Sequence, residues 1–307
     1  MKKIFICMSV IAFTFLFFTF KPYALEEKVI GISIDSNYVE SNVLAPEVIT
    51  STTSTQGYIP IDYANKEEVS NEDLIFGNDD RILLTDAQYT QFPYRCVCRI
   101  YTAYDENGDG VVENYGYYGT GCLVGPKTIL TCSHLMYNSD YGWPMYIEVQ
   151  IGAHVDSVTE QYVTTAVYTS WNYLTVGTVY NTGDASDDWA LLDMNDSIGS
   201  TYGYFSVSTN LSFFNSVKLY GYHGDLNGNM AYGYGLVTFL ETYKFRHNCD
   251  AIAGSSGAPI TYGDTTIVGV HSRGYNAYED QAYRISSYMV TWVNERLSLW
   301  EKYLYLC

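Results

Sequence analysis

A serine flanked by glycines in the last fifth of the chain has the context of a nucleophile. The stretch Gly254-Ser255-Ser256-Gly257 is a Gly-x-Ser-Gly motif. A serine hydroxyl attacks a carbonyl efficiently only when a base takes its proton, and the oxyanion that results needs backbone N–H donors. Gly254 allows a turn that would aim its own N–H and that of Ser256 the same way. Taken alone, the motif also suits an ordinary turn, because Gly and Ser cluster in loops.

A histidine and an aspartate in suitable places could complete an acyl-transfer site. Among the five histidines, His134 directly follows the apolar segment 128–132, so a strand end would hold its imidazole. Asp188 immediately precedes the apolar segment 189–192, where its carboxylate would be partly buried and would need a partner. Asp187 is the alternative for that position. Such a carboxylate fixes the tautomer of the basic histidine. Each residue by itself could equally be a surface histidine or a loop acid.

Short strands and turns must position these residues. The chain has 32 tyrosines and 25 glycines, and short Val/Ile/Thr/Tyr runs lie between Gly/Asn/Asp turns, a pattern typical of all-β extracellular proteins. Segments 119–124 and 128–132 predict a hairpin. A helix is predicted over about 286–300, where apolar residues recur at helical spacing: Met289, Val293, Leu297 and Trp300.

The three candidates occur within an ordered set of motifs. Gly-Thr-Gly-Cys-Leu-Val-Gly-Pro-Lys-Thr-Ile-Leu-Thr-Cys-Ser-His ends at His134, Asp-Trp-Ala-Leu-Leu begins at Asp188, and Gly-Ser-Ser-Gly-Ala-Pro contains Ser256. This set resembles the chymotrypsin-fold serine proteases and, more narrowly, the secreted bacterial glutamyl endopeptidases of the V8-like branch. The resemblance covers about residues 75–300. It is supported by three further segments: 76–81 followed by 92–95, 221–225 and 267–274.

The resemblance implies a fold and a set of roles. The fold would be all-β, with two antiparallel six-stranded β-barrels at about 90–195 and 196–285, followed by the C-terminal helix. Ser256 would attack the scissile carbonyl, and His134 would act as general base and then as general acid. Asp188 would orient His134, and the backbone N–H groups of Gly254 and Ser256 would form the oxyanion hole.

The residues at the expected substrate pocket give mixed indications of substrate preference. In glutamyl endopeptidases a histidine at the place of His271 helps to bind the substrate's Glu side chain, which predicts cleavage after Glu or Asp. The family's usual hydroxyl is missing at Ala251, and another is often found where this chain has Gly274. Asp250 occupies a place that attracts Arg or Lys in trypsin-like enzymes, and Ser272 completes the expected pocket. A broad or basic preference is therefore one alternative, and a non-catalytic, protease-like surface binding protein is another.

The N-terminal quarter of the chain predicts export and processing. Lys2 and Lys3 precede an apolar run over 4–20 and a small residue at Ala24, which indicates a signal peptide over 1–24. An uncleaved anchor is the alternative, since the run is near the lower limit for spanning a bilayer. The acidic, Ser/Thr-rich residues 25–73 predict a removable pro-segment, with a disordered linker as the alternative. The protease domain would be 74–307, secreted and zymogenic.

The overall charge argues against one class of binding partner. The formal net charge is −18, so nucleic acid is an improbable partner, because a phosphate backbone requires clustered Lys and Arg. No segment after the signal is apolar for long enough to span a membrane. We therefore expect a monomer without membrane attachment that acts on protein or peptide substrates.

Six of the seven cysteines follow the signal, and an even count in an exported chain favours disulfides over metal. Cys122 and Cys132 lie on the two arms of the expected hairpin, which predicts a disulfide between them. Cys96 and Cys98, by contrast, alternate along one strand. Their partners are left open between two cysteines nearer the C-terminus: Cys249 and Cys307.

One acidic loop resembles a calcium site. Asp105, Asn107 and Asp109 have the spacing of the first oxygen ligands of an EF-hand loop. The position that should close the loop with an acid is Gly116, and strands flank it instead of helices. We therefore predict a hairpin turn, with calcium as the alternative, and expect no cofactor and no metal at the catalytic site.

Overall fold

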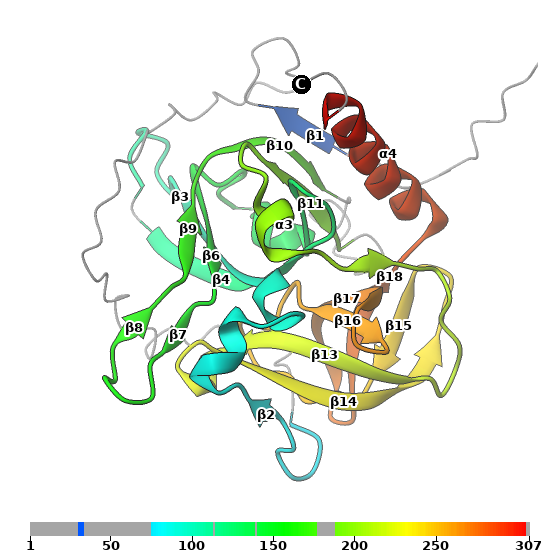
Figure 1. Cartoon of the computed structure of the whole chain (residues 1–307). Helices are drawn as coiled ribbons and strands as arrows, with labels where there is room; N and C mark the ends of the chain where they lie inside the picture. Colours follow the sequence, from blue (N-terminus) through cyan, green and yellow to red (C-terminus); the bar gives the residue numbers. More distant parts are fainter. Residues whose placement is uncertain (1–29, 34–74, 113, 139, 177–187, 305–307) are drawn as a thin grey trace, which may run out of the picture.

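The computed structural model describes residues 30–33, 75–112, 114–138, 140–176 and 188–304. Two β-sheets and one long C-terminal helix make up this part of the chain (Figure 1). The proposed signal peptide, the pro-segment apart from 30–33, Asp187 and Cys307 lie outside the described residues.

The first sheet carries the histidine and the aspartate. Its strands have long buried runs, and β3 is buried at all eight positions, which suits a sheet covered on both faces. A four-residue strand from the N-terminal part, β1, forms one edge of the sheet and pairs antiparallel with β10. In spatial order the strands are β1 (Ile30–Ser33), β10 (Trp171–Val176), β11 (Ala190–Met194), β5 (Thr128–Thr131), β4 (Asn114–Leu123), β3 (Val97–Tyr104), β6 (Tyr146–Ile151) and β9 (Ala166–Tyr168).

The second sheet carries the serine. Pairing between β17 and β18 closes six of its strands into a barrel. The short strand β2 (Ile82–Leu83) adds to β14, and β7 (His154–Val155) pairs with β8 (Tyr162–Val163) in a separate two-stranded sheet. In spatial order the strands are β12 (Ser206–Val207), β17 (Thr266–Asn276), β16 (Pro259–Tyr262), β13 (Ser216–His223), β14 (Asn229–Leu240), β15 (Lys244–His247) and β18 (Glu279–Arg284).

These sheets confirm the predicted fold class. The second barrel is closed, and the first sheet is a half-barrel in which no pairing joins β9 to β10 among the described residues. The predicted hairpin is β4 and β5, with Leu123 opposite Ile129. One large core cluster includes side chains of both sheets, and a smaller one fills the second barrel around Phe245. The loops that follow β5 and precede β16 are thus held on rigid elements.

The C-terminal helix α4 (Ser287–Leu304) is confirmed and runs four residues beyond its predicted end at 300. Met289 and Val293 are buried in the large core cluster, as their helical spacing predicted. Arg296 Nε lies 2.7 Å from Asp193 Oδ2, which ties the helix to β11. No helix within the described ranges combines the length and the apolar character needed to cross a bilayer.

The cysteine prediction is wrong for the described part of the chain. Cys96, Cys98, Cys122, Cys132 and Cys249 are all buried free thiols. The hairpin register places Leu130, rather than Cys132, opposite Cys122. A residue two positions along the partner strand is a diagonal neighbour, about 7–8 Å away, which is beyond the usual span of a disulfide.

The acidic loop forms the predicted hairpin turn between β3 and β4, where Tyr104 pairs with Asn114. The Asp105 carboxylate accepts hydrogen bonds from the backbone N–H groups of Gly108 at 2.7 Å and Gly110 at 2.8 Å. These bonds hold the pKa of Asp105 below its ordinary value. Calcium at Asp105, Asn107 and Asp109 stays the untested alternative.

Candidate active site

The histidine and the aspartate meet across the first sheet. Strand β5 is followed by a one-turn helix, α1 (Ser133–Met136), which carries His134. Asp188 lies just before β11, the neighbour of β5. His134 Nδ1 and Asp188 Oδ2 are 2.8 Å apart. Strand pairing therefore brings together two residues separated by 54 positions in the sequence.

The Asp188 carboxylate is saturated with donors. Its Oδ1 accepts bonds from Ser133 N at 2.9 Å, Ser133 Oγ at 3.0 Å and His134 N at 3.1 Å. Its Oδ2 accepts from His134 Nδ1 and also from Ser272 Oγ. The next residue, Trp189, is fully buried and fixes the backbone. Burial acts to raise the pKa of Asp188, but the neighbouring imidazole and the hydrogen bonds lower it well below the ordinary range.

His134 is held by Asp188 yet open to solvent, since 43% of its side chain is exposed whereas that of Asp188 is 2% exposed. Desolvation acts to lower the pKa of His134, but the charge of Asp188 outweighs it and raises the pKa well above the ordinary value. A proton on Nδ1, donated to Asp188, leaves Nε2 as the basic nitrogen. In this conformation Nε2 lies 3.6 Å from the Cys132 sulfur.

The serine loop connects β15 to β16. Gly254 and Gly257 have φ values of 99° and 85°, which favour glycine, so these two residues allow the sharp turn around Ser256. The turn is closed by Ala258 N, which donates to Ser255 O at 2.8 Å, and by Gly257 N, which donates to His271 O at 2.9 Å. The backbone N–H groups of Gly254 and Ser256 donate to no other described residue, so both are available to an oxyanion.

Ser256 and His134 are not hydrogen-bonded to each other within the described chain. Ser256 Oγ donates to the Ser272 carbonyl at 3.4 Å, and His134 Nε2 faces Cys132. Catalytic hydrogen bonds are often long in free enzymes and tighten when substrate binds. We therefore keep Ser256 and His134 as candidate partners in proton transfer, with Nε2 as the accepting nitrogen.

Thr120 is a supporting residue that the sequence did not single out. Its backbone N–H donates to Ser256 O at 2.8 Å, and its hydroxyl donates to Gly254 O at 2.9 Å. The same hydroxyl accepts a bond from Tyr222 N at 2.9 Å. Thr120 lies on β4 of the first sheet and thereby braces the loop that carries the nucleophile. Only the Gly-Thr-Gly motif before the hairpin could have drawn attention to it.

Of the residues predicted to form the substrate pocket, His271, Ala251 and Ser272 are all buried. His271 is fully buried, and its Nδ1 lies 3.2 Å from Nε2 of His247, a second fully buried histidine that no sequence motif singled out. Ala251 is also fully buried. Ser272 places its hydroxyl on Asp188, so that hydroxyl supports the carboxylate that orients His134.

Asp250 binds the chain's own backbone. Its carboxylate accepts hydrogen bonds from Phe76 N at 2.6 Å and Asp80 N at 3.1 Å, and the residue is 3% exposed. Burial raises the pKa of Asp250, while these two backbone donors act in the opposite direction. The carboxylate therefore anchors the start of the expected protease domain.

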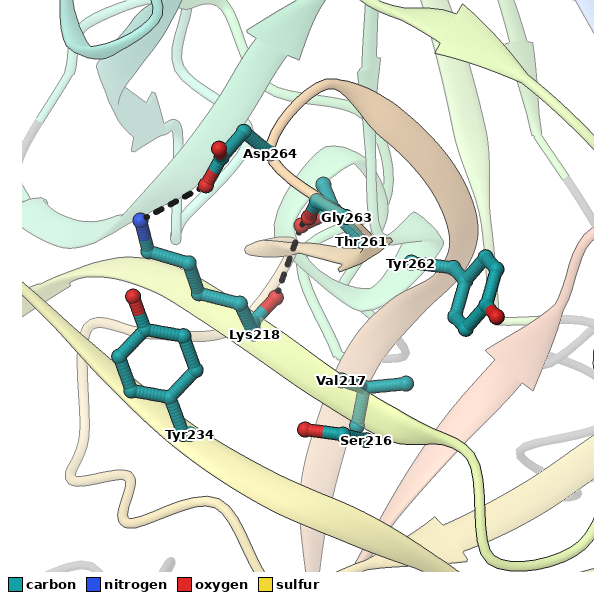
Figure 2. Close-up of a pocket in the computed structure, with 8 residues that line it drawn as sticks. All are labelled: Ser216, Val217, Lys218, Tyr234, Thr261, Tyr262, Gly263 and Asp264. Atoms are coloured by element: carbon teal, nitrogen blue, oxygen red, sulfur yellow. Dashed lines mark hydrogen bonds and ion pairs between the residues drawn. The ribbon is translucent and has the colours of Figure 1, made fainter.

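A separate pocket on the second barrel contains none of these residues. Figure 2 shows Lys218 reaching along it toward Asp264, with Nζ and Oδ1 3.4 Å apart. The Lys218 ammonium also lies 4.0 Å from the ring centre of Tyr232 and 4.5 Å from that of Tyr220. Because the chain's own cation occupies this aromatic cluster, we assign the pocket a structural role.

Comparison with known proteins agrees with this geometry. No family model matches the chain. An extracellular metalloprotease of Bacillus subtilis is 28% identical over 66% of this chain and 64% of its own length, and a glutamyl endopeptidase of Bacillus licheniformis is 27% identical over 61% and 54%. The solved structure of a Glu endopeptidase in complex with MPD is 25% identical, with a TM-score of 0.57 over 73% of this chain and all of that one. The chain thus spans less than two thirds of both curated relatives.

Proposed function

We propose that this chain, a chymotrypsin-fold homologue of the glutamyl endopeptidases, is a serine endopeptidase that forms an acyl-enzyme. The observation that carries the proposal is the Asp188 carboxylate, which is buried, charged and bonded to Nδ1 of a half-exposed histidine. A buried carboxylate with this many donors orients one specific imidazole. Such an orientation has little use unless the other nitrogen, Nε2, serves as a base.

In the proposed reaction, Ser256 Oγ attacks the scissile carbonyl carbon while His134 Nε2 takes the hydroxyl proton. The oxyanion is stabilised by the N–H groups of Gly254 and Ser256, a contribution whose loss costs about 3–4 kcal/mol of barrier. The peptide C–N bond then breaks, and His134 returns the proton to the leaving amine. Water, deprotonated by the same nitrogen, releases the acid product and Ser256.

We further propose a preference for Glu or Asp before the scissile bond. His247 Nδ1 accepts the Cys249 N–H at 3.3 Å, so the proton of neutral His247 is on Nε2 and points to His271 Nδ1. Burial lowers the pKa of His247 well below the ordinary value, and the neighbouring His271 imidazole acts in the same direction, which keeps His247 neutral. The chain of bonds leaves the proton of His271 on Nε2, as a donor suited to a carboxylate.

The two backbone bonds to Asp250 argue against the basic alternative. A carboxylate that recognises Lys or Arg must face the substrate, whereas Asp250 is buried and directs both oxygens at the chain's own backbone, to Phe76 N and Asp80 N. Arg273 lies on the same strand as His271, but its side chain is exposed, so it places no positive charge inside the core.

A metal-dependent reaction, suggested by the name of the Bacillus subtilis relative, suits the donor set less well. A catalytic zinc site needs three ligands and an open position. Cys132, His134 and Asp188 have ligand atoms within 4.8 Å of one another, but both oxygens of Asp188 already accept hydrogen bonds. We therefore assign no catalytic step to a metal and expect activity to survive chelators.

We also propose export and maturation by removal of residues 1–73. Support comes from the signal-like N-terminus and from the relative described as extracellular. The acidic pair Glu72-Asp73 suggests self-processing, since an enzyme that prefers acidic residues could cut there. A Ser256→Ala precursor that matures normally when expressed alone would contradict self-processing.

The decisive test is a serine-directed covalent probe combined with a peptide library. Wild-type protein should be labelled and should cleave after Glu, while Ser256→Ala should lose both properties and retain its circular dichroism spectrum. Ser255→Ala is the matched control, one residue away. Labelling that persists in Ser256→Ala would remove the nucleophile assignment, and unlabelled wild type would favour the binding-protein alternative. Preferential cleavage after Lys would contradict the proposed pocket.

A further inference from the structure

The contact between Cys132 and His134 is not used by the proposed reaction. The Cys132 side chain lies directly before α1, and its sulfur is 3.6 Å from Nε2, the nitrogen that must accept the Ser256 proton. Cys132 is fully buried, whereas 43% of the His134 side chain is exposed to solvent. A thiol and an imidazole nitrogen are both ligands for soft or borderline divalent cations.

The separation of the two atoms fits such a cation. Zinc is bound at about 2.3 Å from sulfur and about 2.0–2.1 Å from imidazole nitrogen, in tetrahedral geometry. A tetrahedral angle with those two bonds places sulfur and nitrogen about 3.6 Å apart, which is the separation observed between Cys132 Sγ and His134 Nε2.

The surroundings favour a positive ion. Asp188 contributes a negative charge with an oxygen within 4.8 Å of the ligand atoms of Cys132 and His134. The hydrogen bonds between Asp188 and His134 hold the imidazole ring in place, so His134 is preorganised as a ligand without any change in the fold. Water or a substrate group would fill the remaining positions.

We propose that Cys132 Sγ and His134 Nε2 form a binding site for a soft divalent cation, Zn²⁺ or Cd²⁺, which inhibits hydrolysis. Binding replaces the thiol proton, which passes to solvent, by a metal–sulfur bond, and the metal–nitrogen bond uses the lone pair of Nε2. The general base is then unavailable to Ser256. The inhibition rests on the proposed peptidase function, whereas the binding does not.

Binding is measured first, without reference to activity, by the ultraviolet cadmium–thiolate charge-transfer band and by zinc calorimetry on the mature protein. Wild type should bind one cation at this site. Cys132→Ser and Cys132→Ala should lose the band and bind zinc at least about tenfold more weakly, because a direct ligand matters more than the outer-shell groups whose loss costs 10–100-fold. Cys249→Ser, a buried cysteine in the second barrel, is the matched control and should bind like wild type.

Inhibition is measured second, with each variant compared to its own metal-free rate. Zn²⁺ should inhibit wild type and Cys249→Ser but not the two Cys132 variants, while Mg²⁺, which prefers oxygen ligands, should inhibit none. Equal zinc affinity in wild type and both folded Cys132 variants would overturn the proposal, as would a disulfide at Cys132 in thiol titration of the denatured protein. Binding that depends on Cys132 in a protein without hydrolysis would support the site and refute only the proposed function.

Discussion

At the scale of single residues, Asp188 sets both the orientation and the basicity of His134. In the proposed reaction the imidazole must be neutral to accept the Ser256 proton, and its pKa is raised well above the ordinary value of about 6.5. Activity should therefore fall as the pH decreases through that raised pKa, earlier than an unperturbed histidine would predict. A profile of kcat/KM against pH, with its acidic limb centred above about 6.5, checks this.

Replacing Asp188 by Asn separates the effect of its charge from the effect of its size. Asp188→Asn keeps the size of the side chain but removes the charge that holds the proton on Nδ1, so kcat should fall by about 10⁴-fold. The histidine pKa should drop toward its ordinary value, which can be followed by NMR of the His134 ring. Ser133→Ala removes only one of the donors to Asp188 and is the matched control. A smaller loss in Asp188→Asn than in Ser133→Ala would contradict the role given to Asp188.

Asp250 offers a second prediction at this scale. Asp250→Asn weakens the bonds to Phe76 N and Asp80 N, and we expect the free energy of unfolding to decrease by about 1–3 kcal/mol. The ratio of Glu to Lys cleavage should stay unchanged, because the carboxylate faces the chain and not the substrate. Urea denaturation and paired peptide substrates measure the two effects. A lost preference without a loss of stability would return Asp250 to the substrate pocket.

At the scale of elements, the serine loop depends on its fit against β4. A Cβ at Gly257 would lie 2.2 Å from the Thr120 carbonyl oxygen, in addition to the strain of its positive φ. Gly263 also has a positive φ, of 71°, but its Cβ would meet nothing within 4 Å. Gly257→Ala should therefore abolish activity and lower the melting temperature strongly, whereas Gly263→Ala should show the cost of strain alone. Equal effects in the two variants would show that the close fit is unimportant.

Replacing Thr120 tests the hydrogen bonds between β4 and the serine loop, whereas the Gly257 variant tests their close packing. Thr120→Val removes the donor to Gly254 O and the acceptor of Tyr222 N, both of which are buried. We expect a loss of about 1–3 kcal/mol in stability and a lower kcat with little change in KM. Thr120→Ser keeps the hydroxyl and should restore most of the activity. If Val and Ser variants behave alike, the hydroxyl does not brace the loop.

At the scale of the whole molecule, the residues before β2 belong to the folded body. Arg81 Nη1 lies 3.0 Å from Asp225 Oδ1, and Asp250 holds Phe76 and Asp80 from a distance of more than 160 residues in sequence. A chain that begins at residue 82 should therefore unfold at a lower urea concentration than one that begins at residue 74. Identical midpoints would show that this segment adds nothing to the fold.

Much of the molecule follows from local sequence. Alternating β-formers, the turn between β4 and β5 and the helical spacing of Met289 and Val293 each depend on neighbours a few residues away, so the all-β class, the hairpin and the C-terminal helix were predictable. The order of His134, Asp188 and Ser256 was equally visible as motifs.

Contacts between distant segments were decided by the tertiary structure. The sequence cannot show that Asp250 turns to the backbone of Phe76, that Thr120 braces the serine loop, or that the hairpin register separates Cys122 from Cys132. Each of these outcomes depends on which partner satisfies a buried polar or sulfur atom, and that choice is fixed only when the two sheets pack together. The proposed nucleophile could thus be named from the sequence, whereas the residues that support the site were decided by the packing of the sheets.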